Sequence, residues 1–176
     1  LEYKKLLISS SIHRYYSAWG RNPITYLKAK YKRPVVELNA EILSKNRIRQ
    51  IEGKKIIIAG MTKELRAFLD VDGEFVAGIP TILLTNFKAD GRYILGLINS
   101  RLYNFYFHQL FGSLSLAGGY LRIGTPQISI LPFKEISEIK QNHIVDLVDK
   151  ILAITSAPGY NPKNPPEEQK KLEKQI

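Results

Sequence analysis

The sequence predicts a mixed α+β domain in which a small, largely antiparallel, twisted sheet packs against amphipathic helices. Three observations lead to this fold class. Apolar runs of strand length, rich in β-branched residues, lie within residues 54–87. Two longer segments, 90–112 and 139–152, carry apolar residues at helical spacing. The chain contains no cysteine, so we expect apolar packing rather than disulfides to hold it together.

Residues 54–87 carry several strand patterns and one strong turn signal. Asp72-Gly73 is a typical two-residue hairpin sequence, and it separates an alternating run from Phe75 and Val76. We therefore expect an antiparallel meander across this segment. The runs predicted as its strands are 54–60, 65–69, 75–76 and 81–85.

Helices are expected on both sides of the meander. A short polar helix is predicted over 39–51. Asp90 is placed to cap a long helix that ends at Gly112, and residues 120–130 are expected to be extended. The apolar stripe of the long helix comprises Ile94, Leu97, Ile98, Leu102, Phe105 and Leu110.

We expect one domain over residues 1–155, followed by an appendage at 156–176. Four prolines and a glycine in 156–166 predict a linker or a wrapped loop. Residues 167–176 are predicted to start a charged helix. The chain begins without an initiating Met, and we expect it to be a piece of a longer protein.

The charge distribution indicates a polyanionic partner. Residues 1–66 hold 15 Lys and Arg against 5 Asp and Glu, which accounts for the whole net charge of +10. Solubility alone does not explain this segregation. A membrane surface would require an amphipathic basic helix, and residues 28–34 have no apolar face. The sequence therefore favours a nucleic acid and gives no indication of a membrane.

Two classes of contact follow from this hypothesis. Residues expected to neutralise phosphates are Arg14, Arg21, Lys28, Lys30, Lys32, Arg33, Lys54 and Lys55. Residues expected to read base edges flank the first hairpin and a glycine-rich turn, and they are Lys63, Arg66, Arg122, Thr125 and Gln127.

No catalytic or metal-binding residue is predicted. The three histidines lie far apart in the sequence. Asn164-Pro165-Pro166-Glu167 superficially matches a base-holding methyltransferase motif, but Glu167 replaces the stacking aromatic residue and no strand pattern precedes it. We therefore expect no cofactor in this chain.

Three segments carry a resemblance to a known family. They read "KKIIIAG…LRAFLDVDGEF", "YILGLINSRLYNFYF" and "ISILPF". In this order they resemble the TaqI-like C-terminal specificity domain, or target-recognition domain, of adenine-N6 DNA methyltransferases and type IIG restriction-modification enzymes. They are also similar to target-recognition domains of type I specificity subunits. The likeness covers roughly residues 10–155, and it assigns no base-reading residue by position.

The resemblance implies a sequence-specific, non-catalytic module in a prokaryotic cytoplasm. Such a module binds duplex DNA and presents it to a covalently linked upstream methyltransferase domain. S-adenosylmethionine, and Mg²⁺ where the enzyme also cleaves DNA, would be bound by the other domains of that enzyme. An RNA-binding or structural nucleoprotein module without sequence readout is the alternative, because it shares the basic and aromatic N-terminal third.

Overall fold

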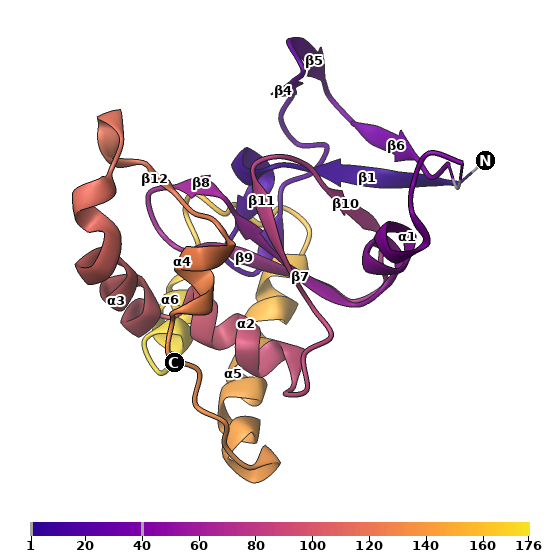
Figure 1. Cartoon of the computed structure of the whole chain (residues 1–176). Helices are drawn as coiled ribbons and strands as arrows, with labels where there is room; N and C mark the ends of the chain where they lie inside the picture. Colours follow the sequence, from indigo (N-terminus) through magenta and orange to yellow (C-terminus); the bar gives the residue numbers. More distant parts are fainter. Residues whose placement is uncertain (1, 40) are drawn as a thin grey trace.

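The chain forms a mixed α+β fold in which several small sheets pack with helices, as its computed structural model shows (Figure 1). The fold class expected from the sequence is confirmed. The structure describes residues 2–39 and 41–176. Residues 1 and 40, which fall in the expected domain 1–155 and the expected helix 39–51, lie outside the described residues.

The central sheet has the order β11-β7-β9, with β7 (Lys55–Ala59) in the middle. Its neighbours, β9 (Ala67–Asp70) and β11 (Thr81–Thr85), both run antiparallel to it. Ile56 and Ile58 belong to the main core on the helical side, whereas Ile57 belongs to a second cluster on the other face. Because both faces of β7 are covered, its sequence is a continuous β-branched run rather than an alternating one.

A second sheet, of order β10-β1-β6, shows where the expected meander is wrong. β10 (Phe75–Ala77) pairs in parallel with β1 (Tyr3–Leu7), which in turn pairs antiparallel with β6 (Val35–Glu37). The chain therefore leaves the central sheet after β9 instead of folding back on it. At this point the Asp70 carboxylate accepts the backbone N–H groups of Glu74 and Phe75, and these hydrogen bonds stabilise the turn that leads into β10.

The long helix expected over 90–111 is two helices, α2 (Gly91–Asn99) and α3 (Arg101–Phe111). Asp90 caps α2 as expected. Ser100 breaks the helix, because its hydroxyl accepts the N–H of Tyr103 and thereby begins α3. α3 buries Tyr103 and Phe107, so Phe105, expected in the apolar core, is exposed instead.

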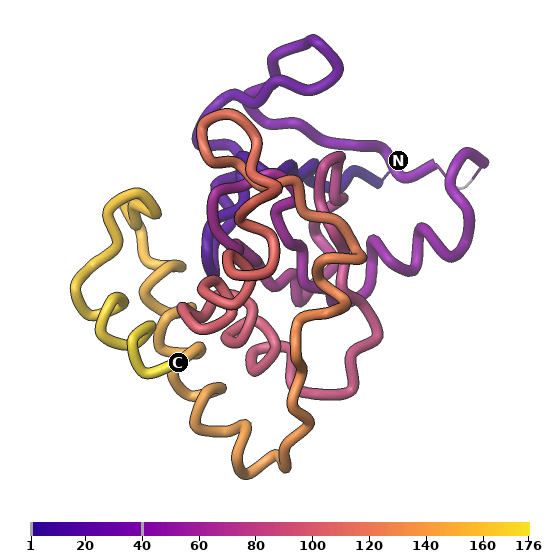
Figure 2. Tube along the Cα trace, turned by 60° about the vertical axis from the view of Figure 1, so that its left-hand side comes forward, coloured from indigo at the N-terminus to yellow at the C-terminus, as the bar shows by residue number. Residues whose placement is uncertain are grey.

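α5 (Glu138–Ser156) forms where helical spacing was found over 139–152, and it packs directly against α2. A Cβ atom at Gly96 would lie 2.8 Å from Cγ2 of Ile144, so the close approach of these helices requires glycine there. The expected appendage wraps back onto the domain. Tyr160 in the proline-rich loop is buried, and α6 (Glu167–Glu173) packs beside α5 (Figure 2).

The remaining elements are short. α1 starts later than the expected residue 39, because the hydroxyl of Ser44 caps it. Residues 120–130 are only briefly extended, since Pro126 in the first turn favours a helix there. The bounds are α1 Lys45–Glu52, α4 Thr125–Ser129, β2 Ile12–His13, β3 Tyr16–Ser17, β4 Ile24–Tyr26, β5 Ala29–Tyr31, β8 Met61–Thr62 and β12 Leu121–Arg122.

Among the described residues, no helix has the length and apolar character needed to cross a bilayer.

A buried ion pair joins the start of β7 to the end of β9. Nζ of Lys55 lies 2.5 Å from Oδ2 of Asp70, and both side chains are inaccessible to solvent. The ammonium group also donates to the carbonyl oxygens of Ile51 and Gly53. Burial lowers the pKa of Lys55, and its contact with the Asp70 carboxylate opposes that shift.

Asp70→Asn is expected to destabilise the chain by about 3–5 kcal/mol, because it leaves a buried ammonium without its counter-charge. Thermal unfolding at neutral pH measures this loss. Burial then lowers the pKa of Lys55 without opposition, so the unfolded state binds more protons and stability should rise toward alkaline pH. Glu74→Gln, which breaks an exposed ion pair with Lys5, is the control and should cost under about 1 kcal/mol. A similar loss in both variants would contradict this role.

Ile98→Ala is expected to cost about 2–5 kcal/mol, because the Ile98 side chain is only 4% exposed in the main core. Phe105→Ala is expected to change stability by less than about 0.5 kcal/mol, since Phe105 is 63% exposed on α3. Denaturant titration of both variants tests the division between α2 and α3. Equal losses would mean that the apolar stripe is continuous across Ser100.

Candidate nucleic-acid interface

Two adjoining hollows form the main candidate site. Their volumes are about 430 and 460 Å³, and both are lined by His13, Arg66 and Lys163. We call the two hollows together the basic groove. The first is completed by α6 and the proline-rich loop, and the second by β8 and Tyr120. Segments far apart in the sequence therefore meet at one surface.

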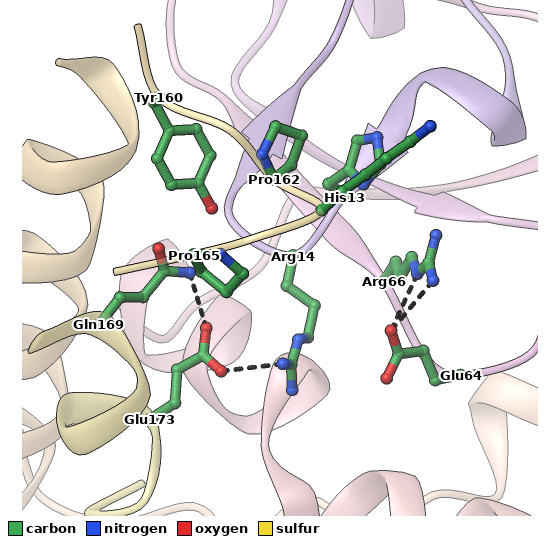
Figure 3. Close-up of a pocket in the computed structure, with 10 residues that line it drawn as sticks. His13, Arg14, Glu64, Arg66, Tyr160, Pro162, Pro165, Gln169 and Glu173 are labelled. Atoms are coloured by element: carbon green, nitrogen blue, oxygen red, sulfur yellow. Dashed lines mark hydrogen bonds and ion pairs between the residues drawn. The ribbon is translucent and has the colours of Figure 1, made fainter. Parts of the chain in front are cut away.

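The first hollow has an ordered floor and two ion pairs (Figure 3). Arg14 Nη2 lies 2.9 Å from Oε2 of Glu173, a buried carboxylate on α6. The amide of Gln169 donates to the same Glu173 side chain. On the opposite wall, Arg66 pairs with Glu64 at 3.0 Å. These contacts hold both arginines in place and neutralise the two carboxylates.

The groove retains a net positive charge. Its lining contains four Lys and Arg side chains but only two carboxylates. Burial, reinforced by the charges of Arg66 and Lys163, lowers the pKa of His13. At neutral pH, His13 therefore presents a neutral imidazole, with one hydrogen-bond donor and one acceptor. Such a lining suits an anionic ligand that also carries polar edges.

The structure places two expected base-reading residues in the groove and a third on a strand beside it. Lys63 and Arg66 line the second hollow directly. Arg122 lies on β12, which pairs antiparallel with β8 so that Arg122 is opposite Met61, another lining residue. The N–H of Ile123 donates to the carbonyl oxygen of Gly60, which fixes this junction. β8 and β12, about sixty residues apart in the sequence, thus form one short two-stranded sheet.

The other two expected readers, Thr125 and Gln127, do not line the groove. Thr125 is the exposed first residue of α4. The Oε1 atom of Gln127 accepts the N–H of Gly124 at 2.9 Å, so it caps this helix. Gln127 therefore has a local structural function in the first turn of α4.

Four expected phosphate contacts lie on or just after the β4-β5 hairpin. Lys28, Lys30, Lys32 and Arg33 are all exposed. The Arg33 guanidinium lies 6.0 Å from the centre of the Trp19 ring. The hairpin stands off the body of the molecule, on the same side as the turn that leads into β12 (Figures 1 and 2). This arrangement places a second concentration of positive charge beyond the groove.

Two further expected phosphate contacts lie outside the basic groove: Arg21, which is bonded within the protein, and Lys54, which lines another hollow. Arg21 donates to the carbonyl oxygen of Tyr160, and its guanidinium lies 5.1 Å from the centre of the Tyr16 ring. Lys54 lines a separate hollow of about 480 Å³ together with Arg49. That hollow shares no lining residue with the basic groove.

The assignment of Lys55 as a phosphate contact is wrong. Its side chain is fully buried and paired with Asp70, so it cannot reach a ligand. The Lys54-Lys55 pair begins a strand, and successive side chains of a strand point to opposite faces. One lysine of such a pair is directed inward unless the sheet is exposed on both sides.

Among the groove residues that the sequence reasoning missed, three have side chains suited to contact an anionic or aromatic ligand: His13, Tyr120 and Lys163. Lys163 lies in the proline-rich loop, where no periodic pattern connects it to the basic third of the chain. His13 is far in the sequence from the other two histidines and was not selected as a contact. Tyr120 is exposed, and Nζ of Lys63 lies 5.2 Å from the centre of its ring. The adjacent glycines were the available signal for Tyr120, since they mark the turn that presents it.

The proline motif contributes Pro165 to the first hollow. The element directly before Asn164 in the chain is the helix α5 and not a strand. Within residues 2–39 and 41–176, no group of three or more His, Asp or Glu side chains is placed to hold a metal ion.

The arrangement can bind a phosphate backbone at the hairpin and contact polar edges in the groove.

Comparison of the chain with protein-family models gave no match, and comparison with curated proteins gave none either.

Proposed function

We propose that this chain is a sequence-specific DNA target-recognition domain of a larger adenine-N6 DNA methyltransferase or type IIG restriction-modification enzyme in a prokaryotic cytoplasm. The chain binds duplex DNA and presents it to a covalently linked upstream methyltransferase domain. Methyl transfer with S-adenosylmethionine, and any Mg²⁺-dependent cleavage, belongs to the other domains. This chain is a binding module and not an enzyme.

One observation carries the proposal. Lys63 and Arg66, expected as base readers, line the second hollow, and Arg122, expected from a distant stretch of the sequence, lies on the neighbouring strand β12 opposite the lining residue Met61. Lysine and arginine are the side chains that best match the O6 and N7 acceptors of guanine in the major groove. A merely soluble basic surface gives no reason for this arrangement.

Binding is expected to have two layers. The exposed cations of residues 28–33 neutralise phosphates, and they supply affinity that does not depend on sequence. The basic groove then contacts base edges, which supplies discrimination. Because the phosphate layer and the reading layer lie on different elements, separate substitutions can remove each one.

The affinity of the 176-residue chain for duplex DNA is expected to fall steeply with salt. Four phosphate contacts at the hairpin give a log–log slope of roughly −4. Replacing Lys30 and Lys32 by Ala should flatten the slope by about two units and weaken all duplexes alike. Fluorescence anisotropy over a salt series measures both effects, and single-stranded RNA serves as competitor.

The matched control replaces Lys140 and Lys150, two exposed lysines on α5, by Ala. This variant has the same net charge as the hairpin variant but should keep the original slope. A flat salt dependence of the unmodified chain, or stronger binding to the RNA, would count against the proposal.

Arg122→Ala is expected to weaken the preferred duplex by about 1–3 kcal/mol and to leave nonspecific binding nearly intact, because a base contact matters only where the right base is present. The preferred duplex is first selected from a randomised library with the unmodified chain. Titration of the selected and a scrambled duplex then measures the difference. An equal loss on both would make Arg122 a phosphate contact or a fold residue.

A further inference from the structure

The tip of the β4-β5 hairpin has an unusual conformation for its sequence. Tyr26 pairs with Ala29, so only Leu27 and Lys28 form the turn. Their φ angles are +48° and +66°, in the left-handed region. Two-residue turns of this kind usually contain Asn and Gly, because other side chains are strained there. The hairpin therefore keeps a leucine and a lysine at a cost in folding stability.

Leu27 is also among the most exposed apolar residues that the structure describes, at 83%. The residues at the base of the hairpin, in contrast, are packed against the rest of the chain. Ile24 at the base of the hairpin is buried, and Tyr26 packs against the cluster that contains Leu6 and Ile51. The tip thus projects from a firmly anchored base, as its position above the rest of the chain in Figure 2 illustrates.

The charge around the tip identifies its partner. Residues 3–36 contain no Asp or Glu and eight Lys and Arg. The four cations of residues 28–33 follow Leu27 directly, and all four are exposed. An exposed leucine on a hairpin whose charged residues are all cations is complementary to an apolar interior between anionic edges. Stacked base pairs between two phosphate backbones have this arrangement.

We propose that the β4-β5 hairpin enters a groove of duplex DNA and that Leu27 inserts as an apolar wedge between base pairs. This inference rests on the proposed function and adds deformation of the duplex to it. Burial of Leu27 between bases offsets the strain and exposure that the free chain carries. Lys28, Lys30 and Arg33 neutralise the phosphates beside the wedge, in the manner of proteins that unstack DNA from a groove.

A mismatch test does not require knowledge of the target sequence. Unstacking costs less at a mismatch than in a matched duplex, so a wedge prefers the mismatched duplex. The 176-residue chain is titrated with two short duplexes that differ only in one central mismatch. We expect about tenfold tighter binding to the mismatched duplex.

Leu27→Asn should abolish this preference while leaving the salt slope unchanged. Asparagine tolerates the left-handed conformation, so the melting temperature of this variant should stay the same or rise. Leu27→Phe retains a large apolar side chain and should keep the preference. The matched control is Ile139→Asn, because Ile139 on α5 is equally exposed, at 83%, and lies outside the hairpin.

The outcomes separate the wedge from the proposed function. If the chain binds neither duplex, DNA recognition itself fails. If it binds both duplexes equally with a steep salt dependence, DNA binding stands and the wedge is overturned, leaving the hairpin with another kind of partner. The wedge is also overturned if the Leu27→Asn variant keeps the preference for the mismatched duplex, or if the Ile139→Asn variant loses that preference.

Discussion

The ion pair between Lys55 and Asp70 is the contact on which the arrangement of both main sheets depends. Asp70 ends β9, pairs with the lysine that begins β7, and accepts two backbone N–H groups at the turn that leads into β10. One carboxylate thus closes the central sheet and starts the second one. Isolated buried charges are costly, and this pair is tolerated because nearly every hydrogen-bonding position around it is used.

The groove depends on this arrangement of sheets. β7 leads through Gly60 into β8, and β12 joins β8 beside it. The hydroxyl of Ser9, which follows β1, accepts the N–H of Gly60, so the second sheet also fixes this corner. The side chains of the candidate groove are therefore supplied by short elements at the edge, while longer strands and α2 and α5 provide the rigid support.

Local patterns predicted the elements whose apolar residues follow a strand or helix pattern within a single run of sequence. The β-branched run of β7 and the helical period of α5 are examples, and Asp90 was identified as a cap from its position alone. The pairing of β10 with β1 could not be predicted, since it depends on a carboxylate at position 70 that meets a lysine fifteen residues earlier. The groove was predicted only in part. Lys63 and Arg66 were selected because they are basic and flank a predicted hairpin, but no local sequence signal shows that Lys163 lies beside them.

The position of α6 determines part of the shape and charge of the groove. Its inner face supplies Gln169 and Glu173 to the floor of the groove, and Glu173 holds Arg14 at 2.9 Å. A displacement of α6 would therefore alter the shape and charge of the groove at the same time. A molecule or segment that binds the outer face of α6 and shifts the helix would therefore be coupled to any ligand of the groove, and the coupling would act on both binding events by the same factor.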